Sequence, residues 1–138
     1  MNLDHICLAV RKIDPAREKL CSILGYRPRT EKVKNTRQKV VVQFICKEGS
    51  IDIKLIEPLS ADSPIVDFLR KGGGIHHVCF RTDDVEAAAN CLSDKGARLV
   101  TPPQPGEAFD EHLIAFLYLG FGLNVEVIDT DDRRAMID

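Results

Sequence analysis

The feature that most constrains the fold of this chain is an internal repeat. His5 and His77 are 72 positions apart (77 − 5), and so are Lys54 and Glu126 (126 − 54). The same register aligns further pairs, namely Cys7 with Cys79, Phe44 with Phe116, and residues 53–56 with 125–128. A spacing that holds at both ends of a segment is typical of a duplicated structural unit. The sequence therefore predicts two copies of one module.

The first copy is expected to contain a strand, a helix and three further strands. Alternating apolar residues predict the strands. Asp14-Pro15 is expected to cap and begin the helix, and Gly25 to end it in a left-handed conformation. The predicted strands cover residues 3–10, 26–33, 39–46 and 51–56.

The second copy repeats this order after a short connection. The connection is expected to hold a helix over 65–71, capped at Ser63-Pro64 and ended by three glycines. Asp84 is then expected to cap the second copy's helix and Gly96 to end it. The predicted strands cover 75–81, 97–100, 112–119 and 123–128, with a proline-rich loop over 101–105.

The length and the repeat together predict one domain. A chain of 138 residues is long enough for one ordinary hydrophobic core but too short for two large domains. We expect a first module over 1–60, a linker helix over 61–74 and a second module over 75–132.

Composition excludes several classes of partner. A net charge of −2 with scattered basic residues gives no basic stripe, so nucleic acid is not an expected partner. No apolar run approaches the roughly 20 residues of a membrane helix, and no leader pattern begins the chain. The five cysteines contain no CxxC pair, so reduced thiols and a cytoplasmic location are expected.

The repeat also predicts where chemistry takes place. An approximate twofold axis between the modules would bring His5 opposite His77 and Lys54 opposite Glu126. Two imidazoles and one carboxylate with open positions suit Fe(II), and also Zn, Mn, Co or Ni. A divalent metal ion held by His5, His77 and Glu126 is therefore expected.

Several motifs resemble those of the vicinal-oxygen-chelate superfamily (glyoxalase/bleomycin resistance/dioxygenase), and the methylmalonyl-CoA epimerase branch is the closest match. They are Leu3-Asp4-His5-Ile6, residues 57–65 with Phe68-Leu69, Gly74-Ile75-His76-His77-Val78, Ala115-Phe116-Leu117 and Val125-Glu126-Val127. The resemblance implies an α+β fold, in which two tandem βαβββ modules form a curled mixed sheet around a central cavity that holds a divalent ion. It also implies a homodimer.

The resemblance carries over to individual positions with three departures. The family's two histidines and final glutamate fall on His5, His77 and Glu126, but Lys54 occupies the position of a fourth ligand, Gln or Glu. Arg37-Gln38 stand near the place of the epimerases' other acid/base glutamate. Residues 108–112 replace a His-Gly-Lys sequence near the substrate. Epimerisation of a coenzyme A ester by two glutamates is thus poorly supported.

Four features allow two interpretations. Lys54 either forms a salt bridge with Glu126 in a metal-free relic of the site, or stabilises a developing enolate or a substrate carboxylate. His76 is expected to point to the opposite face from His77 in a structural role. Cys7 and Cys79 share the histidines' face, as apolar lining or as reactive thiolates. The segment 101–109 either closes over a pocket or is a plain connection.

Three functions remain open. The first is a metal-dependent isomerase, epimerase or lyase that shifts a proton in a small carbonyl or acyl-thioester substrate, with Glu126 and Lys54 as catalytic residues. The second is a non-catalytic protein of the bleomycin-resistance kind that sequesters a ligand beside a vestigial metal site. In the third, dimerisation is the main use of the fold.

Overall fold

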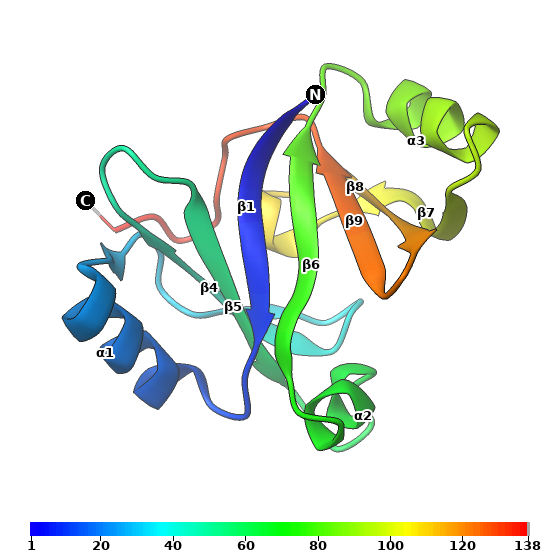
Figure 1. The fold of residues 1–138 in the computed structure, drawn as a ribbon. Coiled ribbons are helices and arrows are strands. Elements are labelled where there is room, and N and C mark those ends of the chain that lie inside the picture. Colours follow the sequence, from blue (N-terminus) through cyan, green and yellow to red (C-terminus); the bar gives the residue numbers. More distant parts are fainter. Residues whose placement is uncertain (138) are drawn as a thin grey trace.

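The two modules form one continuous, curled sheet of nine strands in a computed structural model that describes residues 1–137 (Figure 1). The strand order is β2-β4-β5-β1-β6-β9-β8-β7, and β3 pairs with β4. This confirms the predicted α+β fold class. The elements of the first half are β1 (Asn2–Ala9), α1 (Ile13–Leu24), β2 (Arg27–Pro28), β3 (Val33–Asn35), β4 (Val40–Cys46) and β5 (Asp52–Pro58). After α2 (Ile65–Arg70) follow β6 (Gly74–Arg81), α3 (Val85–Asp94), β7 (Arg98–Pro105), the 3₁₀ turn η1 (Glu107–Phe109), β8 (Leu113–Gly120) and β9 (Leu123–Ile128).

The pairing of the strands reproduces the 72-residue register. The central strands β1 and β6 are antiparallel, and each has a parallel neighbour, β5 beside β1 and β9 beside β6. Cys7 lies opposite Lys54 in the first half, and Cys79 lies opposite Glu126 in the second. The antiparallel centre relates the two halves by an approximate twofold axis. Equivalent strands therefore meet at the centre of the sheet, as predicted.

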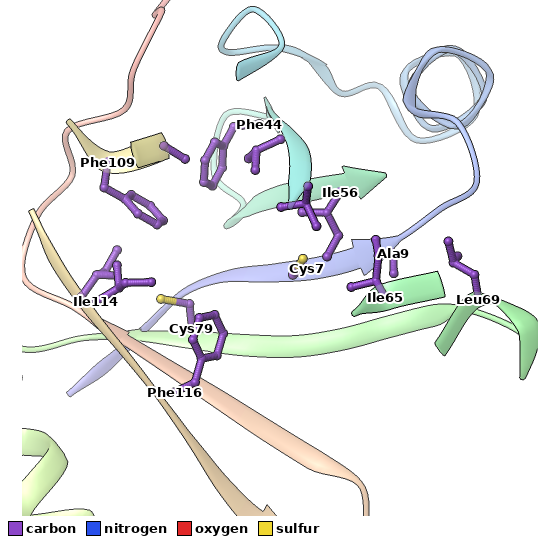
Figure 2. Close-up of a cluster of buried hydrophobic side chains, with 14 residues drawn as sticks. Cys7, Ala9, Phe44, Ile56, Ile65, Leu69, Cys79, Phe109, Ile114 and Phe116 are labelled. Atoms are coloured by element: carbon purple, nitrogen blue, oxygen red, sulfur yellow. The ribbon is translucent and has the colours of Figure 1, made fainter. Parts of the chain in front are cut away.

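Three hydrophobic clusters hold the sheet. The helix α1 packs through Ile13 on one group, and α3 packs through Val85 and Ala89 on another. The third cluster fills the inner side of the curl and includes Phe44, Phe109 and both central cysteines (Figure 2). Along β4, Phe44 belongs to the inner cluster and its neighbour Ile45 to the α1 cluster. The sheet is thus buried on both faces, which leaves its inner side to enclose a site.

One predicted helix cap is confirmed and another is wrong. The Asp84 carboxylate accepts a hydrogen bond from the Ala87 N–H at 3.0 Å, as an N-cap residue should. Asp14 is not a cap, because α1 begins at Ile13. The Ile13 N–H donates to the Glu57 carboxylate at 3.0 Å, and the Ile13 side chain is fully buried. A tertiary partner therefore fixes where this helix begins.

The connection between the modules also differs from prediction at its start. Pro64, and not Ser63, is the N-cap residue of α2, and no side chain caps this helix.

Two predicted stretches of backbone are wrong in detail. The loop expected over 101–105 is part of β7, which is the last strand of the sheet. An edge strand tolerates prolines because only one of its sides must donate hydrogen bonds. The strand expected over 26–33 is divided into the short β2 and β3. Pro28 ends β2, and the N–H groups of Arg29 and Thr30 both donate to the Phe44 carbonyl.

The C-terminal segment ties the second module to the first. In Figure 1 the red trace after β9 crosses toward the β4 side of the sheet. There the Glu31 N–H donates to the Ala135 carbonyl, and the Ile137 N–H to the Arg29 carbonyl, both at 2.9 Å. This crossing places the Arg133 guanidinium against the Phe44 and Phe109 rings of the inner cluster. In the described part of the chain, no helix has the length and apolar character needed to cross a membrane.

Candidate metal centre

One carboxylate oxygen is the meeting point of the predicted site. Oε1 of Glu126 lies 3.1 Å from Nε2 of His5, 3.2 Å from Nε2 of His77 and 3.5 Å from Nζ of Lys54. The side chains are 2% exposed or less. They come from β9, β1, β6 and β5, which are the four central strands. The structure therefore brings together all four residues that the repeat singled out.

His5 is oriented by its neighbour Asp4. Nδ1 of His5 lies 2.7 Å from Oδ2 of Asp4. Burial alone would raise the pKa of Asp4, but the bond from His5 and the charge of Arg133 hold it well below its usual value. An ionised carboxylate only accepts hydrogen bonds, so Nδ1 of His5 carries a proton. Nε2, on the other side of the ring, faces Glu126 at 3.1 Å, and it is the nitrogen that would ligate an ion in a carboxylate–histidine–metal arrangement.

His77 is held by His76, which lies where the sequence did not predict it. The two Nδ1 atoms are 2.8 Å apart, so one of them donates to the other. Burial lowers the pKa of His77 to about 3 and that of His76 to about 4, which leaves both rings neutral. The prediction that His76 points to the opposite face from His77 is wrong, because His76 and His77 line the same pocket.

A pair of β-bulges explains this orientation. Across β1 and β6, Cys7 faces His77 and Leu8 faces Ile75, so His76 is an extra residue without a partner. Asp4 is likewise extra. Asp4 and His76 are again 72 positions apart (76 − 4). Each bulge turns a polar residue toward the histidine that follows it.

Glu126 is a carboxylate with one free oxygen. Burial by itself would raise the pKa of Glu126, but the charge of Lys54 and the contacts with His77 and His5 hold it well below its usual value. Among residues 1–137, its buried Oε2 has no hydrogen-bond partner. A buried oxygen without a partner is costly unless a proton or a cation reaches it.

Three of the four central residues can act as ligands of a divalent ion. Ligand atoms of His5, His77 and Glu126 all lie within 4.8 Å of one another. Two lone pairs from imidazole and one carboxylate form a facial set that such an ion accepts. Lys54 holds the fourth position with its Nζ 5.2 Å from the centre of the Phe109 ring. An ammonium group has no lone pair, so as a cation it opposes an ion there.

The two central cysteines line the inner cluster. Cys7 and Cys79 are fully buried and point into the inner cluster (Figure 2). Burial raises the pKa of Cys7 to about 12 and that of Cys79 well above its usual value. Both thiols therefore stay protonated at neutral pH, which favours the apolar interpretation.

A pocket of about 420 Å³ leads to this centre. Lys54, His76 and His77 line it together with residues from both modules, among them Arg37, Gln38, Thr101, Gln104, Phe116 and Asn124. The turn that contains Arg37 is tied to the second module, because the Thr36 and Arg37 N–H groups donate to the Glu107 carboxylate at 3.0 and 3.1 Å. The segment 101–109 contributes Thr101 and Gln104 to the pocket wall.

Two residues of the centre escaped the sequence prediction. The sequence does contain a signal for Asp4, because Asp4 directly precedes His5 just as His76 directly precedes His77 in the 72-residue register. Arg133 donates to Asp4 at 2.6 Å from a segment outside the repeat, and no pattern in the sequence indicates it.

Similar proteins were found in sequence and in structure. The Bacillus subtilis (strain 168) protein YqjC is 39% identical over 99 residues, covering 71% of this chain and 69% of its own length. An ethylmalonyl-CoA/methylmalonyl-CoA epimerase of Cereibacter sphaeroides is 34% identical over 108 residues, covering 75% and 77%. The mitochondrial methylmalonyl-CoA epimerase of Bos taurus is 35% identical over 101 residues, 72% of this chain but only 57% of that enzyme.

Two solved structures have the same fold along nearly the whole chain. The methylmalonyl-CoA epimerase of Mycobacterium tuberculosis superimposes with a TM-score of 0.81 at 30% identity, covering 93% of this chain and 87% of that one. A Streptomyces coelicolor methylmalonyl-CoA epimerase in complex with 2-nitronate-propionyl-CoA has a TM-score of 0.81 at 28% identity, covering 95% and 98%. Residues 4–116 match the family described as the Glyoxalase/Bleomycin resistance protein/Dioxygenase superfamily. Because this match spans more than half of the chain, the chain belongs to this superfamily.

Proposed function

We propose that this protein is a metal-assisted isomerase that moves a proton at the carbon beside an acyl thioester, in the manner of an acyl-CoA epimerase. The observation that carries the proposal is the convergence of His5, His77 and Lys54 on one oxygen of Glu126, beside a pocket that Lys54 and His77 line. The relatives named as methylmalonyl-CoA epimerases support the same reaction class. A cytoplasmic homodimer remains a prediction.

His5, His77 and Glu126 would hold the divalent ion. When bound, the ion polarises the thioester carbonyl and so acidifies the neighbouring carbon. The chain's own residues exclude water, because every member of the set is buried. His5 and His77 also keep fixed positions through Asp4 and His76.

Glu126 is the proposed base. It is ionised at neutral pH, and its Oε2 has no hydrogen-bond partner in the described residues, so that oxygen is free to accept a proton from the substrate. The low pKa makes Glu126 a weak base. Stabilisation of the enolate must therefore supply much of the driving force for proton transfer.

Lys54 is proposed to supply part of this stabilisation. Its ammonium group is buried beside Glu126 and lines the pocket. A fixed positive charge in a dry site strongly stabilises negative charge that develops on a substrate oxygen. In a site with a neutral or acidic fourth ligand, the ion would have to provide this stabilisation of the enolate. Lys54 would provide part of it here.

Arg37 and Gln38 stand on the pocket wall, and neither can act as the second carboxylate of a two-glutamate mechanism. The reaction proposed for this chain therefore begins with removal of the substrate's α-proton by Glu126. The proton held by Glu126 can then exchange with solvent. The Streptomyces coelicolor relative was solved with an acyl-CoA analogue, which supports acyl-CoA esters as the first substrates to test.

The test is deuterium exchange at the α-carbon of methylmalonyl-CoA in D₂O, followed by NMR with Co²⁺ or Zn²⁺ present. We expect exchange with the wild-type protein and a loss of at least about a hundredfold in Glu126→Gln, since general-base catalysis contributes about 10²–10⁴. The control is Glu48→Gln, which alters an exposed carboxylate. Binding of the ester without exchange would contradict the proposal and favour a ligand-sequestering protein.

A further inference from the structure

We propose that Arg133 is a positioning residue, which acts through Asp4 to fix the direction in which His5 presents Nε2 to the metal centre. The inference rests on the proposed function, since it assigns a role within the same site. It concerns the side of His5 that faces away from the pocket.

Three buried groups form a continuous chain of contacts. NH2 of Arg133 lies 2.6 Å from Oδ2 of Asp4, and this same oxygen lies 2.7 Å from Nδ1 of His5. Nε2 of His5 then faces Glu126 at 3.1 Å. The side chains of Arg133 and Asp4 are each 1% exposed. The contact is therefore protected from the solvent screening that weakens surface ion pairs.

The surroundings of Arg133 fix its position. Its guanidinium lies 4.5 Å from the centre of the Phe44 ring and 5.0 Å from that of Phe109. The same two rings contact His5, with ring centres 5.3 and 5.9 Å apart. A movement of Arg133 would thus disturb both the carboxylate and the aromatic walls that hold His5.

Arg81 provides an internal comparison. It donates to the other oxygen of Asp4, Oδ1, through its Nε at 3.1 Å and its Nη2 at 2.5 Å, and its side chain is 43% exposed. The Arg133 side chain is 1% exposed, so its contact with Asp4 is less weakened by solvent screening than that of Arg81. Arg133 is therefore the partner expected to set the orientation of Asp4.

The two histidines of the site are held by different groups. Nδ1 of His77 lies 2.8 Å from Nδ1 of His76, which lines the pocket. Nδ1 of His5 instead lies 2.7 Å from Oδ2 of Asp4, and Arg133 binds this same oxygen at 2.6 Å. Arg133 thus adds a second buried anchor behind His5.

The test compares Arg133→Met and Arg133→Lys with Arg134→Met, which alters the neighbouring, partly exposed arginine. We expect Arg133→Met to weaken Co²⁺ affinity by about 10–100-fold, the usual cost of losing such an outer partner. Arg133→Lys, which keeps a donor for Asp4, should recover part of the affinity, and Arg134→Met should leave it unchanged. Equal affinity in wild type and Arg133→Met would overturn the proposal.

A second measurement keeps the inference separate from the proposed function. In ion-free protein labelled with ¹⁵N histidine, NMR should show a downfield, slowly exchanging Nδ1 proton on His5. This signal should weaken or broaden in Arg133→Met and persist in Arg81→Met. If wild type binds no ion while the signal behaves in this way, the proposed function fails and the positioning role stands. An unchanged signal in folded Arg133→Met would contradict the positioning role.

Discussion

Lys54 is the residue on which the properties of the centre most depend. Its ammonium lies 3.5 Å from Oε1 of Glu126, at the position where the related epimerases are expected to carry a Gln or Glu. Two unit charges 4 Å apart interact by about 4 kcal/mol at an effective dielectric constant of 20. The charge on Lys54 therefore both holds Glu126 ionised and opposes a divalent cation at the same place.

Replacement of Lys54 by Gln should increase the affinity for divalent ions. The substitution removes the opposing charge and adds an amide oxygen that can act as a ligand, so we expect at least a tenfold lower Kd for Co²⁺ by calorimetry. Lys39→Gln is the matched control, because Lys39 pairs with Asp62 at the surface. A weaker affinity in Lys54→Gln would show that the lysine assists the ion.

The five thiols should differ sharply in reactivity. Cys7 and Cys79 are buried, and burial keeps their pKa values above the range in which thiolates form at pH 8. Cys91 is exposed. We expect iodoacetamide at pH 8 to label Cys91 in the native protein and Cys7 and Cys79 only after unfolding, as read by peptide mass spectrometry. Rapid native labelling of Cys7 would restore the reactive-thiolate interpretation.

At the scale of elements, Asp84 and Asp14 should differ in how much they contribute to the free energy of unfolding. Asp84→Ala removes a hydrogen bond to the Ala87 N–H and should lower the free energy of unfolding by about 1 kcal/mol. Asp14 only forms exposed pairs with Arg17 and Lys32, so Asp14→Ala should cost less than about 0.5 kcal/mol. Urea denaturation measures both. A larger loss for Asp14→Ala would contradict the assignment of the caps.

Two sequence patterns gave wrong predictions at the scale of elements. The period of two that assigns His76 to the outer face fails because a bulge depends on the partner strand, here the stretch from Cys7 to Leu8. Likewise, the prolines of residues 102–105 are compatible with a strand only at the edge of a sheet. Neither fact is present in the local sequence, since both are properties of the assembled sheet.

At the scale of the whole molecule, the internal repeat predicts most of the arrangement of the site. The register that pairs His5 with His77 also fixes where Glu126 and Lys54 meet, because equivalent strands occupy equivalent places around a twofold axis. Arg133 could not be found in this way. It reaches the site through a terminal segment that crosses from one module to the other, and such a crossing has no counterpart in the first module.

The symmetry of the molecule and the asymmetry of its site thus have separate origins. Duplication supplies four central strands and a polar residue on each. Divergence of single positions, Lys54 against Glu126 and Asp4 against His76, then gives each half a different chemical role. Single side chains in the pocket, which the repeat does not fix, determine the substrate.

Anomalous diffraction from crystals soaked in Co²⁺ tests whether an ion binds at this centre. We expect one strong peak between the two modules, about 2.0–2.2 Å from Nε2 of His5, Nε2 of His77 and an oxygen of Glu126. The Lys54 ammonium should then lie farther from Glu126 than the 3.5 Å of the ion-free arrangement. A peak elsewhere, or no peak with the pair of Lys54 and Glu126 intact, would contradict it.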